Sequence, residues 1–408
     1  MKFKATPKEQ LQILSVGAAD IVSKDELLKK LEKSYETQTP LVVKLGADPS
    51  APDIHLGHTV VLQKMRQFQD LGHQVVFLIG DFTGRIGDPS GKKKTRPALS
   101  EEEVMLNAET YKKQIGKVLD IEKTKIVFNS HWLSKMTFAD VLKLSSQYTV
   151  ARMLERDDFE NRFKNQEPIS VVEFMYPLMQ GYDSVALKAD VELGGVDQTF
   201  NLLVGRELQR AYNQAPQAII TMPILEGLDG HEKMSKSLGN YVGVNESPSQ
   251  IYGKIMSIPD SLMLKYYQLL TSLSLEEIND IKQKITTQPK AAKMMLAKQI
   301  TSQYHGAQAG DEAEAEFEKM FGKTGDGLPD NIEDFNLSAD SDGIALMKIL
   351  VESKMVPSGK EARRMLQQGG VKINQEKECD GQKLFTPGAD FILQVGKRKF
   401  KKIIISAG

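Results

Sequence analysis

Short apolar runs alternate with longer segments of helical periodicity through the first 220 residues of the chain. The apolar runs, which predict strands, are residues 41–46, 74–80, 124–129, 190–193 and 217–221. The periodic segments, which predict helices, are residues 59–71, 101–119, 171–188 and 197–212. Such an alternation is typical of βαβ units, whose strands form a parallel sheet. We therefore predict one α/β domain over residues 1–240.

The pattern changes after residue 240, where prolines separate helical stretches and predict an α-helical domain over residues 241–325. These prolines are Pro248, Pro259 and Pro289. Acidic residues and glycines dominate residues 326–342, which is typical of an exposed linker. The remaining residues, 343–408, form a compact segment that we expect to be a third domain.

The charges of the whole chain nearly balance, with 53 Lys and Arg against 54 Asp and Glu. No net field draws the molecule to nucleic acid or to an anionic membrane, so any nucleic-acid site must be local. The segment 344–405 is the exception, because its 13 basic residues outnumber its 6 acidic ones.

Cysteine use and hydropathy point to the cytoplasm. The single cysteine, Cys379, excludes an internal disulfide and a cysteine-built zinc site, which fits a reducing compartment. The first residues are unlike a signal peptide, and no apolar run approaches the length that crosses a bilayer. We expect a cytoplasmic protein without a membrane partner.

A first candidate site lies between a predicted strand and the helix that follows it, in the sequence from Gly46 to His58. His55 and His58 are three residues apart and share one face at a helix N-terminus, where unpaired amides attract anions. Gly57 between them leaves room for a bulky ligand to approach the backbone. Taken alone, the pair could also be part of a metal site or a plain helix cap.

A second candidate site is the glycine-rich segment that contains Lys233-Met-Ser-Lys-Ser237. Lys233 and Lys236 supply point charges that can follow a phosphate as its geometry changes, and the hydroxyl of Ser237 can donate to the same oxygens. Taken alone, a solvated basic loop would be the better interpretation. Because the lysine segment follows the histidine segment in this order and at this spacing, a phosphate-binding loop is the better interpretation of the two together.

Together the two segments resemble the paired signatures of class I aminoacyl-tRNA synthetases. The resemblance implies a Rossmann-like catalytic domain and a reaction in which an amino-acid carboxylate attacks the α-phosphorus of ATP before transfer to tRNA. Such a reaction needs no protein nucleophile, so catalysis comes from positioning and from charge stabilisation. We expect His55, His58, Lys233 and Lys236 to do this work. Mg²⁺ should accompany ATP as a substrate complex, and we assign no metal ligands in the chain.

Four further stretches resemble one family of this class, the tyrosyl-tRNA synthetases, over essentially the whole chain. In the stretch from Asp81 to Lys92, the resemblance assigns Asp88 to the substrate ammonium. It also places Lys92 and Arg96 in a loop near the pyrophosphate, although a solvated turn is nearly as good an interpretation for each of them.

Tyr176, Gln180 and Asp183 fall at i, i+4 and i+7 and line one helix face. A buried hydrogen-bond network would be a structural account of them. The resemblance instead assigns Tyr176 and Gln180 to the ammonium and Asp183 to the phenolic hydroxyl. Bound phenylalanine would leave this carboxylate desolvated and without a hydrogen-bond donor, so such a site rejects phenylalanine. These enzymes are themselves the standard example of this discrimination.

The stretch from Gly194 to Gln198 resembles the ribose-binding segment of the family. It assigns Asp197 to the ribose hydroxyls, with Gln198 close to the substrates. Asp48 lies on another edge of the nucleotide.

One residue departs from the best-known branch of the family. There, a second tyrosine contacts the substrate hydroxyl four residues before the aspartate that aligns with Asp48, whereas this chain has Lys44. The departure puts that hydroxyl contact in doubt and keeps tryptophan, the substrate of the sister enzyme, as an alternative.

The basic segment near the C-terminus resembles the small α+β RNA-binding domain known as S-four-like. It predicts a basic helix, a glycine turn and a strand, with Lys360, Arg363, Arg364 and Lys372 as tRNA contacts. The basic run 397–402 could equally be a solvated strand edge. By resemblance alone, the helical domain faces the anticodon, the partners are tRNA(Tyr), tyrosine and ATP but not DNA, and the enzyme is a homodimer.

Two rival hypotheses remain open at this point. A small nucleotidyltransferase could share the histidine signature, although the lysine signature and the basic C-terminal segment count against it. A catalytically retired RNA-binding homologue is the other, and the many retained polar site residues count against that hypothesis.

Overall fold

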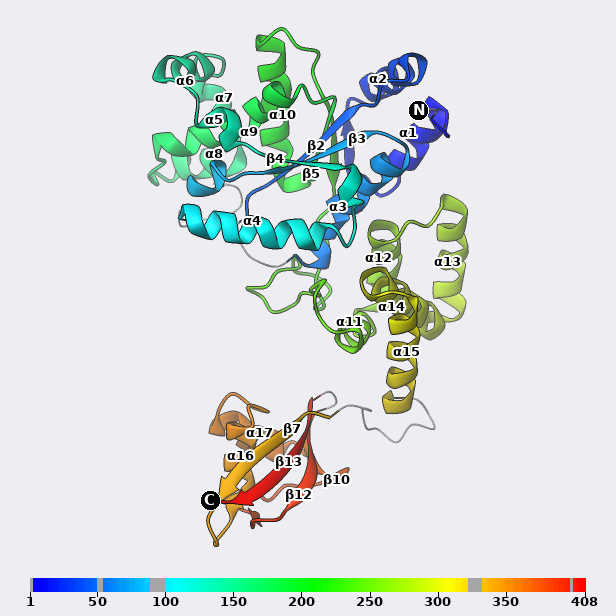
Figure 1. Cartoon of the computed structure of the whole chain (residues 1–408), viewed down its shortest axis with the longest axis vertical. Helices are drawn as coiled ribbons and strands as arrows, with labels where there is room; N and C mark the ends of the chain where they lie inside the picture. Colours follow the sequence, from blue (N-terminus) through cyan, green and yellow to red (C-terminus); the bar gives the residue numbers. More distant parts are fainter. Residues whose placement is uncertain (1–2, 50–53, 89–99, 322–331, 397–398) are drawn as a thin grey trace. The chain divides into compact units, whose positions relative to one another are not determined.

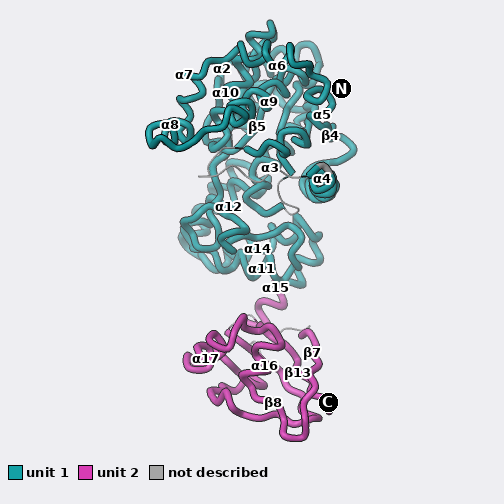
Figure 2. The backbone as a smooth tube through the Cα atoms, turned by 90° about the vertical axis from the view of Figure 1, so that its left-hand side faces the viewer, with its two compact units in different colours: residues 1–313 teal, residues 314–408 magenta. Residues whose placement is uncertain are grey.

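The computed structural model describes residues 3–49, 54–88, 100–321, 332–396 and 399–408. The chain forms two compact units, residues 1–313 and residues 314–408 (Figures 1 and 2). Each unit is described by itself below. Within the described ranges, no helix combines the length and apolarity needed to cross a bilayer.

Unit 1 is built on a six-stranded sheet in the order β1-β6-β5-β2-β3-β4. Its strands are β1 (Asp20–Val22), β2 (Val42–Ala47), β3 (Gln74–Ile79), β4 (Thr124–Phe128), β5 (Val191–Gly195) and β6 (Ala218–Met222). The pairs among β2 to β6 are parallel, and β1 alone runs antiparallel to its neighbour β6. The parallel α/β sheet and the five predicted strands are therefore confirmed.

Helices cover both faces of this sheet. Figure 1 shows α9 (Val171–Leu187) and α10 (Thr199–Ala211) on one side of the sheet and α3 (Leu56–Asp70) on the other. The remaining helices of this part are α1 (Pro7–Ser15), α2 (Lys24–Thr37), α4 (Glu101–Ile115), α5 (Ser130–Leu133), α6 (Phe138–Ser145), α7 (Val150–Met153) and α8 (Asp157–Lys164). Short 3-10 turns are η1 (Thr83–Arg85), η2 (Ile121–Lys123) and η3 (Val196–Gln198).

The strand order reverses between β2 and β5. From β2 the chain continues to β3 and β4 on one side of the sheet, and from β5 it continues to β6 on the other. Open α/β sheets bind ligands in the crevice outside the carboxyl ends of the strands at such a switch point. Asp48 directly follows β2 and Asp197 follows β5, so the fold brings these predicted site residues to one edge.

Four further helices belong to unit 1, and two of them contact α3. They are α11 (Pro248–Ile255), α12 (Met263–Leu270), α13 (Leu275–Thr287) and α14 (Pro289–His305), with the turn η4 (Asp260–Leu262) between the first two. The Tyr304 hydroxyl of α14 donates to Thr59 Oγ1 of α3 at 3.2 Å. Because these helices belong to the same compact unit as the sheet, a domain boundary at residue 240 remains a prediction.

Unit 2 is a small α+β assembly. It begins within α15 (Ala307–Phe321), and its sheet has the order β10-β9-β12-β13-β7. Its other elements are β7 (Asp334–Ala339), β8 (Ile344–Ala345), α16 (Leu346–Glu352), α17 (Gly359–Gln367), β9 (Val371–Ile373), β10 (Glu376–Lys377), β11 (Leu384–Phe385), β12 (Asp390–Val395) and β13 (Lys399–Ala407). The predicted basic helix, turn and strand are α17, Gly369-Gly370 and β9.

Strand β7 lies inside the segment 326–342, whose composition predicts a linker. Its acidic and polar residues alternate with Phe335, Leu337 and Ala339, which pack against the core of unit 2. β7 runs parallel to β13, from Asp334 opposite Lys402 to Ala339 opposite Ala407. The overall acidity of the segment hides the alternation of a half-buried strand.

A buried imidazole ties the N-terminal helix to the sheet. His73 Nδ1 accepts from the backbone N–H of Leu41 at 3.2 Å, so the ring proton sits on Nε2, which lies 2.8 Å from Gln10 Oε1 of α1. Only a neutral ring can accept and donate in this way. Burial lowers the pKa of His73 to about 4, against an opposing effect of the Asp190 charge.

We expect this imidazole to make unit 1 less stable in mild acid. Below pH 6.5 the unfolded chain takes up a proton that the native ring takes up only near pH 4, so stability falls as the pH drops through this window, by up to about 3 kcal/mol. Urea unfolding at pH 7.0 and pH 4.5 should show a smaller pH effect for His73→Asn than for wild type. His131→Asn, at an exposed histidine, should behave as wild type, and an unchanged pH effect in His73→Asn would contradict the assignment.

Candidate active site

The two predicted imidazoles cap the first turn of α3. His55 is the N-cap residue, and its Nδ1 accepts from the backbone N–H of Gly57 at 3.1 Å. His58 Nδ1 accepts in turn from the backbone N–H of His55 at 3.3 Å, and the ring centroids lie 3.9 Å apart. Since both Nδ1 atoms accept, the neutral rings carry their protons on Nε2, as donors for an anion.

Gly57 is required by this geometry. A Cβ at residue 57 would lie 2.9 Å from the His55 ring and 3.6 Å from Cβ of Met234. The fold therefore brings the histidine signature directly against the lysine signature, although 176 residues separate His58 from Met234 in the sequence. A backbone bridge between His55 and Gly243 fixes the two segments together.

The lysine segment presents its charges beside the imidazoles and the turn predicted to bind ribose. Lys233 Nζ lies 3.2 Å from Asp197 Oδ2, so two predicted ATP-site residues form an ion pair. Burial lowers the pKa of His55 to about 3, and the charges of Lys236 and Lys233 act in the same direction, as does His58 when it is protonated. The hydroxyls of Ser235 and Ser237 lie 2.7 Å apart on the same turn. The site is therefore electropositive around a neutral His55.

The carboxylate predicted to bind the substrate hydroxyl is fully buried. Asp183 of α9 is 1% exposed and accepts two side-chain hydrogen bonds. Trp132 Nε1 donates to its Oδ1 at 2.8 Å, and Asn129 Nδ2 donates to its Oδ2 at 3.3 Å. Burial raises the pKa of Asp183 to about 7, against the opposing effects of the Lys44 charge and the two donors. This carboxylate can accept a proton donor of the substrate without competition from water.

Asp48 sits between two predicted substrate-binding elements. Its Oδ2 accepts from the Tyr176 hydroxyl at 2.7 Å, and its Oδ1 accepts from Thr83 Oγ1 at 2.7 Å. A Cβ at Gly80 would fall within 2.0 Å of the same Oδ1, so residue 80 must be glycine. Burial and the nearby carboxylates raise the pKa of Tyr176, which stays a donor.

A polar chain joins the predicted ammonium ligands. Gln198 Nε2 donates to Asp88 Oδ2 at 3.1 Å. Asn201 Nδ2 donates both to Gln198 Oε1 and to Gln180 Oε1, each at 3.0 Å. Arg156 extends the chain, because its guanidinium lies 3.9 Å from the Asp88 carboxylate. Residues from distant parts of the sequence therefore converge on one polar patch.

The ammonium of Lys44 has its partners within the protein, on α9 and β5. Its Nζ donates to the carbonyl of Gln180 and to Ser184 Oγ, and it pairs with Glu192. Lys44 is therefore a buried, paired cation whose donors are already used, and it offers none to a substrate hydroxyl.

Two predicted ATP contacts, Lys92 and Arg96, lie outside the described residues. Their assignment to the pyrophosphate end of the site stays a prediction.

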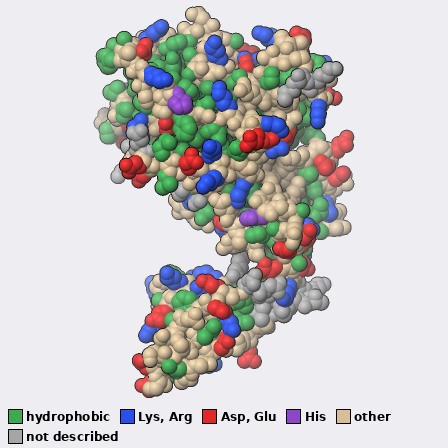
Figure 3. Space-filling model, in the orientation of Figure 1, with side chains coloured by type: hydrophobic (Ala, Val, Ile, Leu, Met, Phe, Trp, Pro, Cys, Tyr) green, Lys and Arg blue, Asp and Glu red, His purple; other side chains and the backbone are tan. Residues whose placement is uncertain are grey.

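The predicted tRNA contacts lie in unit 2. Lys360, Arg363 and Arg364 lie on α17, and Lys372 is half-buried on β9. Figure 3 shows Lys and Arg side chains next to one another on the visible face of this unit, interspersed with acidic ones. Arg364 is paired with Glu361 at 2.5 Å.

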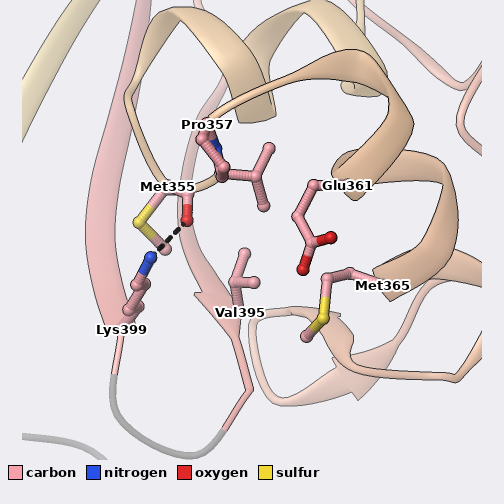
Figure 4. Close-up of a pocket in the computed structure, with 7 residues that line it drawn as sticks. Met355, Pro357, Glu361, Met365, Val395 and Lys399 are labelled. Carbon is pink, nitrogen blue, oxygen red and sulfur yellow. Dashed lines mark hydrogen bonds between the residues drawn. The ribbon is translucent and has the colours of Figure 1, made fainter. Parts of the chain in front are cut away.

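A pocket of about 320 Å³ lies beside this helix. Figure 4 shows Glu361 and Met365 of α17 on one side of it and Val395 of β12 between them and Lys399. Lys399 Nζ donates to the carbonyl of Met355 at 2.9 Å. The basic surface of unit 2 therefore includes an apolar recess.

Several side chains of the site were not singled out in the sequence. They are Thr83, Asn129, Trp132, Arg156 and Asn201. One signal was available, because Asn129 and Trp132 directly follow the strand β4, at the ligand-binding edge of a parallel sheet. Arg156 and Asn201 could be recognised only once the structure placed them beside Asp88 and its partner Gln198.

Comparison with known proteins matches both parts of the chain. The family model of class I tRNA synthetases (W and Y) matches residues 36–322. The model of the tyrosine–tRNA ligase SYY-like C-terminal domain matches residues 326–403.

Relatives and solved structures agree with these matches. A tyrosine–tRNA ligase of Carboxydothermus hydrogenoformans is 57% identical over 97% of this chain and 98% of its own, and one of Desulfotalea psychrophila is 54% identical over 98% of both. A truncated mitochondrial tyrosyl-tRNA synthetase of Aspergillus nidulans, 23% identical, shares the fold with a TM-score of 0.65 over 78% of this chain and 95% of its own. The chain therefore belongs to the tyrosine–tRNA ligase family of class I aminoacyl-tRNA synthetases.

Proposed function

We propose that the crevice at the carboxyl ends of β2 and β5 activates tyrosine with ATP and transfers the tyrosyl group to the 3′ end of tRNA(Tyr). The observation that carries this proposal is the pairing of a dry, doubly hydrogen-bonded carboxylate, Asp183, with two imidazoles and two lysines that the fold brings to one site. One end of the site suits a phenol and the other suits phosphates.

At the phosphate end, two imidazole donors and two lysine cations stabilise the negative charge that builds up on the phosphates during adenylate formation. His55 and His58 offer Nε2–H donors at the N-terminus of α3, and Lys233 and Lys236 supply mobile positive charge. Lys233 must leave Asp197 to reach phosphate, which frees Asp197 for the ribose. Mg²⁺ enters as part of the ATP complex. The other residues proposed for ATP are Asp48, Gly57, Gln198, Lys92, Arg96 and Ser237.

At the tyrosine end, Asp183 accepts the phenolic proton and the polar chain around Asp88 holds the ammonium. Gln180 belongs to that chain through Asn201. Tyr176 is a further proposed ligand of the ammonium, and its hydroxyl also donates to Asp48. Tryptophan is not favoured as substrate, since the relatives that match nearly the whole chain are tyrosine–tRNA ligases.

For tRNA, we assign the basic surface of unit 2 to phosphate contacts through Lys360, Arg363, Arg364 and Lys372. The helices α11 to α14 are the proposed anticodon-facing part, and the enzyme acts in the cytoplasm.

We also propose a homodimer, formed through the α8 and α9 region of unit 1. Phe163 of α8 is 64% exposed, and Val171 at the start of α9 is 78% exposed. The Arg162–Glu173 ion pair joins these two elements, so the exposed side chains belong to one area. Apolar surface of this kind is typical of protein interfaces. A second copy is the proposed occupant, because an isologous contact buries the same residues from both chains.

Asp183→Asn should lower tyrosine-dependent pyrophosphate exchange by about two orders of magnitude, because the amide cannot accept the phenol proton as a carboxylate does. Exchange should be measured with tyrosine, phenylalanine and tryptophan. Asp70→Asn, at an exposed carboxylate at the end of α3, is the matched control and should leave exchange unchanged. Wild-type exchange with tryptophan would overturn the substrate, and no exchange with any amino acid would overturn the activity.

Arg363→Ala combined with Lys360→Ala should weaken tRNA binding several-fold and leave pyrophosphate exchange unaltered. The salt dependence of tRNA affinity should also become shallower, by about one unit of slope for each phosphate that is no longer neutralised. Binding of tRNA(Tyr) at several salt concentrations measures both effects. Lys348→Ala, at an exposed lysine of α16, serves as the control, and wild-type slope in the double variant would refute the assignment.

Phe163→Glu should shift the protein from dimer to monomer, because two carboxylates would face each other across the symmetric contact. Analytical ultracentrifugation gives the mass of each species. Leu275→Glu introduces the same charge at an exposed leucine of α13 and should leave the mass unchanged. A wild-type monomer, or a dimer that tolerates Phe163→Glu, would exclude this interface.

A further inference from the structure

The ammonium of Lys44 is one of the most deeply buried charges of the described chain, with a side chain that is 0% exposed. Its three donors have three partners. They are the carbonyl of Gln180 at 3.1 Å, Ser184 Oγ at 2.8 Å and Glu192 Oε1 at 2.8 Å. The lysine on β2 thereby joins the middle strand of the sheet to α9 and to β5.

Glu192 is also buried and is held from the other side. Its Oε2 accepts from Ser184 Oγ at 2.9 Å and from the side-chain amide of Gln217. Burying such a pair costs desolvation energy, and apolar residues of similar volume often give equal or greater stability. Stability alone therefore does not account for an ion pair between β2 and β5 that also contacts the helix carrying Asp183.

The partners of Lys44 on α9 lie on either side of Asp183 in the sequence, the residue proposed to bind the phenolic hydroxyl. Gln180 precedes Asp183 by three residues and Ser184 follows it by one, so Lys44 holds the helical turn that carries the carboxylate. Trp132 and Asn129 hold the same carboxylate from the segment that follows β4. The position of Asp183 is thus fixed both from β2 and from the end of β4.

The pair also sets the charge environment of Asp183. The charged groups that act on it are Lys44 of β2 and Glu192 of β5, which have opposite effects on its pKa. Among the opposing effects on the burial-raised pKa, the charge of Lys44 is the largest. Asp48 and Asp88 act together with Asp183 on Tyr176 of the same helix, whose pKa they raise.

We propose that Lys44 and Glu192 form a positioning pair for Asp183, in which the ammonium holds the α9 turn that carries the carboxylate and Glu192 holds the ammonium. The inference rests on the proposed role of Asp183 in binding the tyrosine hydroxyl. Lys44 does not touch the substrate. It acts on tyrosine recognition through Asp183, in place of a second residue that would contact the hydroxyl.

The two halves of the pair should shift the pH profile in opposite directions. Lys44→Met removes the positive charge and leaves Glu192, so Asp183 is protonated at higher pH and the acid limb of kcat/KM for tyrosine moves up. Glu192→Gln removes the negative charge and leaves Lys44, so the limb moves down. The double variant should return the limb toward wild type.

The measurement is tyrosine-dependent pyrophosphate exchange between pH 5.5 and 9, with KM for tyrosine and for ATP determined at each pH. For Lys44→Met we expect kcat/KM for tyrosine to fall about tenfold or more at pH 7 and to recover partly at pH 9, with KM for ATP little changed. Lys44→Arg keeps the charge and should keep the acid limb. Lys64→Met is the matched control, since Lys64 is a buried lysine whose donors go to the end of α1 and to Gln67.

Two outcomes would overturn the inference. In the first, Lys44→Met and Glu192→Gln lose activity but the acid limb of the kcat/KM profile stays where it is in wild type. In the second, the acid limb moves in the same direction in both variants. Glu192→Gln preserves shape and decides the question even if Lys44→Met does not fold. Asp183→Asn separates the two proposals. If this variant still recognises tyrosine as wild type does, the proposed function of Asp183 fails. If it loses tyrosine recognition but Lys44→Met and Glu192→Gln do not shift the acid limb in opposite directions, only the positioning role is refuted.

Discussion

The structure of the site depends on the parallel pairing of β2 with β3 on one side and β5 on the other. Parallel strands end at the same edge of a sheet, so every segment that follows one of them starts at that edge. Asp48, Asp81, Asn129 and Asp197 all follow strands of this sheet. The strand order reverses between β2 and β5, the point at which open sheets of this kind bind ligands, and the N-terminus of α3 follows β2 at the same edge.

The two ends of the crevice use opposite electrostatic environments. At α3, the helix N-terminus and the two lysines concentrate positive potential around a His55 that burial keeps neutral. Under α9, burial would keep Asp183 protonated, and the neighbouring cation and donors oppose this. At each of these two places, burial and neighbouring charges together set the protonation state of a predicted site residue.

The sequence predicted most of this fold, because its signals are local. The strands expected from apolar runs and the helices expected from periodicity match β2 to β6, α3, α4, α9 and α10. The sequence did not predict the strand β7, because the acidic composition of the segment obscured its period-2 pattern. The pattern becomes apparent only in the structure, where Phe335 and Leu337 pack against a core. Composition describes an average, whereas a strand depends on alternate positions.

For the site, the sequence by itself determined which chemical groups are available. These groups are the histidine and lysine signatures, the carboxylate of Asp183 and the basic helix near the C-terminus. Only the tertiary structure decided which groups meet. The contacts of Trp132 with Asp183, of Asn201 with Gln180 and of Lys44 with Glu192 join residues that are 51, 21 and 148 positions apart. Neither spacing nor periodicity encodes such pairs, because they arise from how the helices pack on the sheet.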